Sequence, residues 1–488
     1  MKKAVIIGSG VGGLAVSIRL AHKGYNVAVY EANAYPGGKL TAFELDNYRF
    51  DAGPSLFTLP HLVDELFELC GEDPRSYFDY KRCNDICHYF WDDGDAYVMP
   101  ADEQDQIDSL SQHFGLDKSI IRRHLTLNKK KYNKTKSIFL ERSLHKVKSY
   151  LSTDVIKGML STPQLQLFRS LDSVNTLRFG SNEKLVQLFN RYATYNGSSP
   201  YKTPGIMSMI PHLEMNLGTY FPKGGMIEIT KSLYKLAKKV GVSFHLNTPV
   251  ESILHQNDRA YGIVANGKKA TADIVVSNAD VSTTYERLLT GTKHPKKHLA
   301  QERSSSALIF YWGIDRQFQE LGLHNIFFSK DYKAEFADIF ERKIVNDDPT
   351  VYINITSKYN PDDAAVNGEN WFVMINTPGD FGQDWDTIIP KARQNIIEKI
   401  NARLGVNITD HIDCESMLTP ALIESKTSSL NGSLYGTSSN NLFSAFLRHP
   451  NFSRQFNNLF FVGGSVHPGG GIPLCLNSAK IVSNLIDA

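Results

Sequence analysis

The sequence predicts an α/β fold in which one domain is assembled from segments that lie far apart in the chain. A strand, a glycine-rich turn and a helix follow one another near the N-terminus, and a second such unit closes the chain. The composition, with 42% hydrophobic and 21% charged residues, is typical of globular proteins. A chain of 488 residues is long enough for one large or two medium domains.

The first unit is KKAVIIGSGVGGLAVSIRLAHKGYNVAVYEAN, residues 2–33. Residues 4–7 are a β-branched run suited to a buried strand, and residues 25–30 predict a second strand. Between them, residues 8–13 match the pattern G-x-G-x-x-G and residues 14–20 have helical character. The order strand, tight turn, helix and strand predicts a Rossmann-type unit.

Each glycine of this turn has its own expected role. Gly8 permits the tight turn, Gly10 lets a pyrophosphate approach the backbone, and Gly13 lets the helix pack closely on the sheet. The helix N-terminus adds unpaired N–H groups and a partial positive charge. Glu31 follows about twenty residues later, where a carboxylate accepts hydrogen bonds from ribose hydroxyls. An acid there favours FAD or NAD over NADP; the alternative is a βα turn without a ligand.

Two further turns lie in the stretch AYPGGKLTAFELDNYRFDAGPSLF. In the first, residues 36–39, Gly38 allows close backbone approach and Lys39 would place a cation beside a phosphate. Residues 41–51 alternate as a short strand pair would, and residues 53–55 form the second turn. The alternative is a solvated hairpin.

Residues 86–214 differ in sequence pattern from the preceding segment. Helical periodicity dominates there, and residues 117–151 are strongly basic. Lysines and arginines, Lys131 among them, far outnumber the acids and are interleaved with apolar residues such as Ile121 and Leu125. This pattern is typical of a helical surface that rests on anionic lipid headgroups. The alternative is an ordinary charged helix face.

Strand and helix signals alternate again downstream of the basic stretch. Residues 224–225 form a turn into a helix, and residues 250–256, 259–264 and 271–277 predict strands. Residues 291–440 mix strand and helix and are rich in aromatic residues. Because aromatic side chains at strand spacing usually belong to the core, we expect only some of them to line a ligand site.

The closing residues repeat the glycine signal. Residues 459–462 predict a strand, a glycine run follows, and a helix begins at Ile472. Two phosphate-suited turns so distant in sequence indicate one extended ligand held by a discontinuous domain, with another domain threaded between its segments. Residues 457–478 are uncharged but dense in glycine and proline, so they predict no membrane-spanning helix.

Charge and cysteine content exclude several classes of protein. A net charge of +2 provides no general basis for binding nucleic acid. Five cysteines predict no disulfide scaffold and suit a reducing cytoplasm. Cys83, Cys87 and His88 have no second ligand pair at zinc spacing, so no metal site is expected. Residues 1–3 lead straight into the first strand, and we therefore expect no signal peptide.

Several longer motifs occur in a fixed order along the chain. After the first glycine turn come PGGK, FDAGPS, YFPKGGM, SNAD and GGSVHPGGGIP. In this order they resemble the phytoene desaturase-like carotenoid desaturases, FAD-dependent relatives of the amine oxidases, and the likeness covers essentially the whole chain. DAGPSLFTLPHLVDELF and HPGGGIPLCLNSAK are most similar to the 1-hydroxycarotenoid 3,4-desaturases. The resemblance implies an amine-oxidase-like architecture with FAD as the cofactor.

The resemblance also implies which residues bind FAD. They are Gly8, Ser9, Gly10, Gly12 and Gly13 at the pyrophosphate, Glu31 at the adenosine ribose, Gly38, Lys39, Pro54 and Ser55 in the turns that follow, Val250 on the adenine side, and Gly464, Ser465, Gly470, Gly471 and Ile472 beside the flavin. Lys39 stands where many relatives have arginine, so a point charge replaces a planar fork.

The motifs and the changes in sequence pattern along the chain predict two domains. Residues 1–85, 215–290 and 441–488 would form a discontinuous FAD-binding domain. Residues 86–214 and 291–440 would form an inserted, mixed α/β domain that faces the substrate and the membrane.

The activity implied by the resemblance is desaturation of a C–C bond beside a polyene, in which one carbon loses a hydride to the flavin and its neighbour loses a proton. The most similar subfamily implies a 3,4 double bond in an acyclic 1-hydroxy end group. Phytoene- or lycopene-type desaturation and terminal-methyl oxidation are the alternatives. Because a carotenoid is stored in membrane, we expect a cytoplasmic enzyme that binds the membrane peripherally, through residues 117–151.

No triad or pair of carboxylates identifies a catalytic base. His212 and Glu214 precede the YFPKGGM motif and are candidates for reaching the inter-domain cavity and taking the proton. A structural polar role is the alternative for both. His467 of the closing motif is a further candidate, with stabilisation of the turn as its alternative.

Two other functions stay open on the sequence. Amine oxidases often set aromatic rings before the flavin, one of them frequently near the C-terminus, whereas no Trp follows Trp385 here. Prenyl-binding GDP-dissociation inhibitors share the fold and carry lipids without flavin. The intact glycine pattern with Glu31 favours an FAD enzyme over such a carrier. The sequence indicates no oligomeric state.

Overall fold

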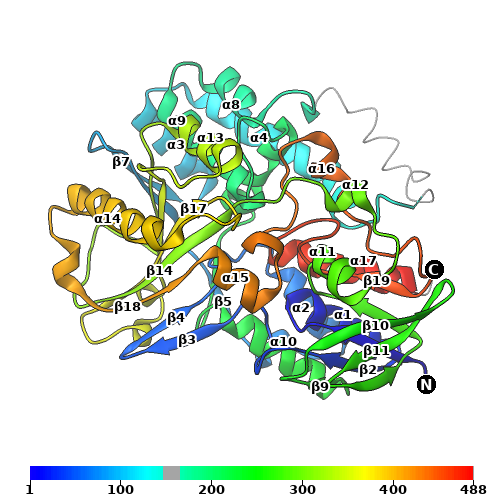
Figure 1. Ribbon diagram of the computed structural model, residues 1–488. Coiled ribbons are helices and arrows are strands. Elements are labelled where there is room, and N and C mark those ends of the chain that lie inside the picture. The colour runs from blue at the N-terminus through cyan, green and yellow to red at the C-terminus, as the bar shows by residue number, and fades with distance from the viewer. Residues whose placement is uncertain (147–164, 487–488) are drawn as a thin grey trace.

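The structure is a computed structural model that describes residues 1–146 and 165–486. A parallel sheet and a larger mixed sheet form its two main parts. Both ends of the chain lie beside the parallel sheet, at the lower right of Figure 1. The predicted fold class, α/β with a discontinuous nucleotide-binding sheet, is confirmed.

The parallel sheet joins strands from separated parts of the chain in the order β19-β13-β1-β2-β9. Every neighbouring pair in it is parallel. Its strands are β1 (Lys3–Ile7), β2 (Asn26–Tyr30), β9 (Ser243–His245), β13 (Ile274–Ser277) and β19 (Leu459–Phe461). Because parallel strands end at one edge of a sheet, the turns after β1 and β19 meet there.

Helices cover one face of this sheet and a small antiparallel sheet covers the other (Figure 1). The helices are α1 (Val11–His22), α2 (His61–Leu69), α10 (Ile227–Lys239) and α17 (Ile472–Ile486), and the small sheet consists of β10 (Val250–Gln256), β11 (Arg259–Ala265) and β12 (Lys268–Thr271). Side chains alternate along β1, so Ala4 and Ile6 pack on the helices while Val5 and Ile7 pack on the small sheet.

The expected single strand over residues 271–277 is wrong. The structure divides it at Asp273, with β12 in the small sheet and β13 in the parallel sheet. The Asp273 carboxylate accepts a hydrogen bond from the Lys3 backbone N–H at 2.8 Å, and its carbonyl accepts one from Asn458 Nδ2 at 2.5 Å. These contacts hold the crossing between the two sheets, and the sequence pattern carries no signal for them.

The mixed sheet has seven strands in the order β18-β14-β17-β16-β15-β6-β7. They are β6 (Asp85–Phe90), β7 (Ala96–Pro100), β14 (Ser306–Ile314), β15 (His324–Phe327), β16 (Val351–Ile355), β17 (Glu369–Thr377) and β18 (Ile412–Leu418). The helix α14 (Trp385–Leu404) covers one face, where Phe310 and Trp312 are buried against it. The opposite face contacts the hairpin β3 (Ala42–Leu45) and β4 (Tyr48–Asp51).

A group of helices closes the far end of the mixed sheet (Figure 1). It includes α3 (Glu103–Phe114), α4 (Lys118–Thr135), α8 (Leu171–Phe179), α9 (Glu183–Asn190) and α13 (Tyr332–Ala337). The described parts of residues 86–214 are therefore mainly helical as expected, except that they begin with β6 and β7. The shorter elements are β5 (Tyr80–Arg82), β8 (Tyr220–Pro222), α11 (Val281–Thr283), α12 (Lys296–Leu299), α15 (Pro420–Thr427) and α16 (Leu442–Phe446).

The basic stretch forms α4 and a π-helical turn, Lys136–Leu140, and its part from residue 147 to 151 lies outside the described residues. Ile121 and Leu125 are buried in the protein core, so they do not form an apolar face toward solvent. Lys131 is also buried, and its Nζ donates to Ser208 Oγ at 2.6 Å. Within the described residues, no helix combines the length and the apolar character needed to span a membrane.

Candidate functional site

The first glycine turn has the geometry expected of a close-packed βα junction. Gly8 has φ of +89°, a conformation that favours glycine. A Cβ on Gly13 would lie 2.1 Å from the Gly8 carbonyl oxygen, so only glycine fits between helix and strand. Cβ atoms on Gly10 and Gly12 would meet the Asn278 side chain at 2.8 and 2.7 Å. The turn thus leaves no room for a Cβ at Gly10, Gly12 or Gly13, which pack against the Gly8 backbone and the Asn278 side chain.

The helix α1 begins directly at this turn, with Gly10 as its N-cap. Among the described residues no side chain caps it, and Gly10, Val11 and Gly12 border a cavity. The first N–H groups of a helix have no partner within the helix and carry a partial positive charge. This end of α1 is therefore suited to bind an anion such as a phosphate.

Glu31 stands immediately after β2, and its carboxylate is fixed from two sides. The Ser9 backbone N–H and hydroxyl donate to Oε2 at 2.7 and 2.8 Å, and the Asn33 N–H donates to Oε1 at 2.9 Å. The side chain is buried yet borders the same cavity. Ser9 thus acts through Glu31, which is held ready to accept hydrogen bonds from a polyol.

The closing glycine turn lies against the first one. A Cβ on Gly12 would be 3.2 Å from the Gly463 backbone, and a Cβ on Gly464 would be 3.2 Å from Gly470 Cα. Ser465 Oγ accepts a hydrogen bond from the Val281 N–H at 3.0 Å. We call residues 8–13 and 463–472 together the glycine wall.

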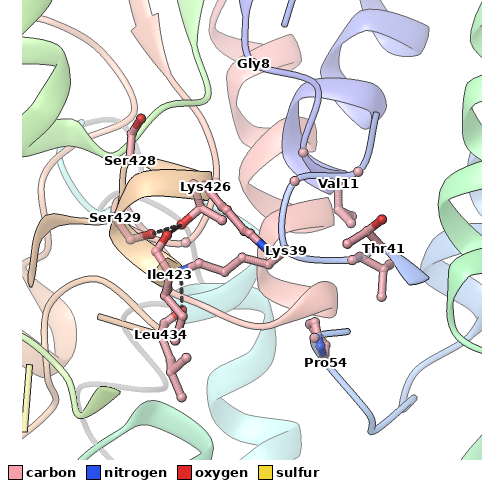
Figure 2. Close-up of a pocket in the computed structure, with 18 of the residues that line it drawn as sticks. Gly8, Val11, Lys39, Thr41, Pro54, Ile423, Lys426, Ser428, Ser429 and Leu434 are labelled. Carbon is pink, nitrogen blue, oxygen red and sulfur yellow. Dashed lines mark hydrogen bonds between the residues drawn. The ribbon is translucent and has the colours of Figure 1, made fainter. Parts of the chain in front are cut away.

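A single cavity of about 980 Å³ connects the two turns (Figure 2). Most of the residues expected to bind FAD border it, and these are Gly8, Gly10, Gly12, Glu31, Gly38, Lys39, Pro54, Ser55, Val250, Gly464, Ser465, Gly470, Gly471 and Ile472. Ser9 and Gly13 lie behind this surface, where Ser9 holds Glu31 and Gly13 packs on Gly8. The sequence therefore identified side chains and turns that the fold brings to one cavity.

Lys39 extends across the cavity toward the loop that carries Leu434 (Figure 2). Its Nζ donates to the carbonyl oxygens of Ser433 and Leu434 at 2.9 and 3.0 Å. Burial lowers the pKa of Lys39 from 10.5 to about 8, although the nearby Asp280 carboxylate acts in the opposite direction. Lys39 is thus a half-buried cation anchored to backbone carbonyls.

The opposite side of the cavity is apolar. Its residues Ile309, Tyr311, Phe372, Met374 and Leu418 come from β14, β17 and β18, and we call them the sheet wall. Strand register pairs Tyr311 with Phe372, and Ile309 with Met374 and Leu418, so all five lie on one face of the mixed sheet. A surface of this kind favours a hydrocarbon group over a charged one.

Neither of the expected proton acceptors borders the cavity. Glu214 is fully buried, paired with the Arg191 guanidinium, and accepts a hydrogen bond from Tyr192 Oη at 3.2 Å. His212 is buried beside Tyr132, and its Nδ1 lies 2.8 Å from Asn216 Oδ1. Burial raises the pKa of Glu214, although the Arg191 guanidinium acts in the opposite direction, and burial lowers the pKa of His212. Both are held as structural polar groups.

His467, the further candidate, is held within the closing turn. Its Nε2 lies 2.8 Å from the Arg142 carbonyl oxygen, and its backbone N–H donates to the His449 carbonyl. Burial lowers the pKa of His467 to about 4. The peptide bond between His467 and Pro468 is cis. These contacts agree with the stabilising alternative for this residue.

Asn278, Tyr195 and Tyr435 are among the residues of the site that were not identified from the sequence. Asn278 lies between the two glycine turns, since a Cβ on Gly463 would be 2.8 Å from its Oδ1; its SNAD motif was the available signal. Tyr195 and Tyr435 border the cavity, and Tyr435 packs directly against Gly470. The closing turn therefore does face an aromatic ring, supplied by an upstream loop that carries no local signal.

The family described as flavin containing amine oxidoreductase matches residues 11–487. The chain belongs to this family. A 1-hydroxycarotenoid 3,4-desaturase of Flavobacterium sp. (strain P99-3) is 55% identical over 486 residues, which cover 100% of this chain and 99% of the relative. A 4,4'-diapolycopene oxygenase of Methylomonas sp is 32% identical, with 100% and 98% covered.

Solved structures of this fold include a putrescine oxidase variant, with a TM-score of 0.64 and 11% identity over 100% of this chain and 99% of that one. An oxidoreductase from Methanosarcina mazei has a TM-score of 0.64 and 15% identity over 99% and 100%. At these identities the likeness concerns the fold alone. It confirms the expected amine-oxidase-like architecture.

The residues present fit FAD, the cofactor that the family implies. The uncapped start of α1 offers N–H donors. Gly10 and Gly12 bring bare backbone to the cavity at positions where a Cβ would collide with Asn278, and Glu31 offers a fixed carboxylate. The cavity is continuous from Val250 to Gly470. The protein is an FAD-dependent oxidoreductase.

Proposed function

We propose that the protein is a carotenoid desaturase that introduces a 3,4 double bond into the 1-hydroxylated end group of an acyclic carotenoid. One observation carries this proposal, namely 55% identity, over the whole chain, to a relative named for that reaction. The sheet wall supports it, because a polyene is a hydrocarbon and gains free energy when it leaves water for an apolar surface.

The FAD contacts proposed here follow the cavity from end to end. The start of α1, with Gly10, holds the pyrophosphate, and Glu31 accepts hydrogen bonds from the adenosine ribose. Val250 borders the adenine side, and residues 464–472 border the flavin. When bound, FAD supplies the ring that accepts the hydride from the substrate carbon.

The chain itself contributes position and exclusion of water. The sheet wall would hold the polyene flat, so that one C–C bond is presented repeatedly in the same orientation. Tyr435 and Tyr195 would complete the enclosure at the flavin end. We propose no proton-transfer role for His212 or Glu214, since neither side chain reaches the cavity.

We propose the domain division expected from the sequence. Residues 1–85, 215–290 and 441–488 would form the FAD-binding domain, with residues 86–214 and 291–440 as the substrate domain. In support, all strands of the parallel sheet fall in the first set, and those of the mixed sheet fall in the second apart from the first residue of β6. The hairpin of β3 and β4 belongs to the first set but packs on the mixed sheet.

Peripheral binding to an anionic membrane is also proposed, through the described part of residues 117–151. The exposed face of α4 carries Arg122, Arg123, Lys129 and Lys130. Because the apolar residues of α4 face inward, the contact would be electrostatic and would weaken with salt.

Vesicle sedimentation tests the membrane proposal. Reversal of three charges, R122E/K129E/K130E, should abolish binding to anionic vesicles at low salt. The matched control K231E/K235E/K238E reverses three exposed lysines on α10 and should still sediment. Sedimentation of the α4 variant at the wild-type level would exclude this helix as the contact.

Product analysis tests the desaturase proposal. Purified, FAD-loaded protein should remove two hydrogens from a 1-hydroxylated acyclic carotenoid, and mass spectrometry with chromatography should locate the new bond at C3–C4. The panel includes phytoene, lycopene and a 4,4'-diapocarotenoid, because one relative is named as an oxygenase of such a substrate. Addition of oxygen in place of hydrogen loss would contradict the proposal.

A further inference from the structure

The apolar face that borders the cavity becomes polar one strand beyond the sheet wall. Register pairs Met374 of β17 with Tyr352 of β16, and Tyr352 in turn with Ile326 of β15. His324, two residues before Ile326, therefore lies on the same face as Tyr352. The ring of Tyr352 contacts Phe372, with centroids 6.3 Å apart, and so borders the sheet wall directly.

A chain of hydrogen bonds runs from the cavity into this polar region. Ser55 borders the cavity, and its Oγ lies 2.8 Å from Tyr352 Oη. Tyr352 Oη lies 2.8 Å from His324 Nδ1, and both residues are held within the fold by Asn354 and Phe372. Ser55 is thus the polar end, exposed in the cavity, of a row of buried groups.

The direction of each hydrogen bond in this row follows from Asn354. Its Nδ2 donates to the Leu323 carbonyl at 2.9 Å, which fixes this atom as the amide nitrogen, and donates also to His324 Nδ1 at 3.2 Å. Nδ1 is therefore an acceptor whose one lone pair is shared by two donors, and the Tyr352 hydroxyl, at the shorter distance of 2.8 Å, donates to it. Ser55 must then donate to Tyr352. The Ser55 oxygen then has only lone pairs to offer, so in the cavity it can accept a hydrogen bond but cannot donate one.

We infer that Ser55, oriented by Tyr352 and His324, accepts a hydrogen bond from the hydroxyl group of the substrate's end group and so selects hydroxylated carotenoids. This inference rests on the proposed function. A tertiary alcohol offers one O–H donor, which an apolar wall cannot satisfy and which Ser55 Oγ can. Ser55 is the binding group, and Tyr352 and His324 are positioning residues.

A proton-relay role for the same row is less well supported. Burial, with the Arg191 charge nearby, lowers the pKa of His324 to about 3, so its imidazole stays neutral. Its Nε2 is buried and, within the described residues, has no hydrogen-bond partner to which a proton could pass. Ser55, Tyr352 and His324 thus stay neutral, and each of their hydrogen bonds has one donor and one acceptor that do not exchange. Such a set of groups is suited to bind a hydrogen-bond donor rather than to store a proton.

Discrimination between two substrates tests the inference. We compare a 1-hydroxylated acyclic carotenoid with its unhydroxylated analogue, by kcat/KM and by Kd from quenching of tryptophan fluorescence. Ser55→Ala should lower the preference for the hydroxylated substrate about five- to tenfold, the effect of one hydrogen bond. The loss should appear in KM and Kd with kcat nearly unchanged, because the contact is present before and during reaction.

Tyr352→Phe keeps the ring against Phe372 but releases Ser55 from its fixed direction, so a smaller loss of preference, about two- to fivefold, is expected. The matched control is Tyr97→Phe. Tyr97, on β7 of the same mixed sheet, also pairs with a serine, Ser109 of α3, at 2.7 Å, and neither residue borders the cavity. This control should leave the preference at the wild-type value.

The outcomes separate this inference from the proposed function. If wild-type protein desaturates the hydroxylated substrate and Ser55→Ala keeps the wild-type preference, the inference is overturned and the proposed function stands. If Ser55→Ala lowers FAD affinity, measured by flavin fluorescence, and leaves the preference intact, Ser55 serves the cofactor instead. If wild-type protein binds and converts the unhydroxylated analogue preferentially, both fall.

Discussion

The two walls of the cavity present different atoms to it: the glycine wall presents main-chain atoms, and the sheet wall presents side chains. The glycine wall presents backbone, because Gly12 and Gly13 leave no room for a Cβ and Gly8 has a positive φ that favours glycine. The sheet wall presents side chains, and each of its residues sits on a regular strand that would form with many other apolar residues.

This difference predicts how each wall responds to change. Its glycines have no side chain to remove, so substitution of Gly12 or Gly13 inserts atoms into close contact and moves the main chain. A side-chain wall can be trimmed while its strands stay paired, so substitution should change what is bound more than whether the protein folds.

The largest effect is expected at Gly13. A Cβ there would lie 2.1 Å from the Gly8 oxygen, so Gly13→Ala must separate α1 from β1. We expect a loss of about 1–3 kcal/mol in the free energy of unfolding and purification without bound flavin. Denaturant titration and the flavin absorption spectrum measure both quantities.

Gly24→Ala is the control at the other end of α1. Gly24 also has a positive φ, +86°, but nothing lies within 4 Å of its Cβ position. Its substitution should cost about 1 kcal/mol and leave FAD bound. Equal loss of flavin in both variants would show that general instability, and not the glycine wall, is being measured.

The second effect concerns Glu31. Glu31→Gln keeps the shape but replaces one acceptor oxygen by an amide, which then faces the Ser9 or Asn33 donors. Because hydrogen bonds to a carboxylate are about twice as strong as neutral ones, FAD affinity should fall about 10- to 100-fold. Titration of FAD by fluorescence quenching measures it, with the exposed Glu44→Gln as control. An unchanged Kd would remove Glu31 from the FAD site.

The glycine wall could be predicted from the sequence because its requirements are local. Gly8 needs its φ and Gly13 its missing Cβ within one turn of chain, and this leaves the pattern G-x-G-x-x-G. Glu31 follows at the end of the next strand, where the βαβ geometry fixes its place. The parallel sheet was predicted for the same reason.

The sheet wall could not be predicted in this way. Tyr311 and Phe372 meet only because β14 pairs with β17, and Lys39 finds its carbonyl partners 394 and 395 residues away. Aromatic residues at strand spacing look alike on both faces, so Phe310 in the core could not be told from Tyr311 at the cavity. Pairing between strands that lie far apart in the sequence determines which of these aromatic side chains faces the core and which faces the cavity.

A third, smaller effect is the pH dependence that Lys39 imposes on the FAD-free protein. Burial and the charge of Arg303 lower the pKa of Lys39 from 10.5 to about 8, against the influence of Asp280. Between pH 8 and 10.5 the unfolded chain keeps a proton that the folded protein has released. The free energy of unfolding therefore rises with pH in that window. Below it Lys39 is charged in both states, and its contribution does not change with pH.

Comparison with Lys39→Met isolates this contribution. From pH 8 to 9, the wild-type stability should gain about 1 kcal/mol relative to the variant, as measured by denaturant titration. Binding of FAD beside Lys39 would raise its pKa and flatten the difference. Parallel profiles for both proteins would mean that the Lys39 charge is already neutralised in the fold.

The smallest effect, and the sharpest test of the comparison, concerns the sheet wall. Phe372→Leu should cost about 1 kcal/mol of stability, leave the FAD content unchanged and raise KM for the carotenoid about threefold with little change in kcat. Phe310→Leu is the matched control, since Phe310 is buried in the same sheet but faces α14. It should lower stability similarly and leave KM alone. If both variants raise KM equally, the effect arises from a loosened sheet, and the sheet wall does not contact the substrate. If only Phe372→Leu raises KM, side chains of the sheet wall form the substrate side of the cavity, while backbone of the glycine wall forms the cofactor side.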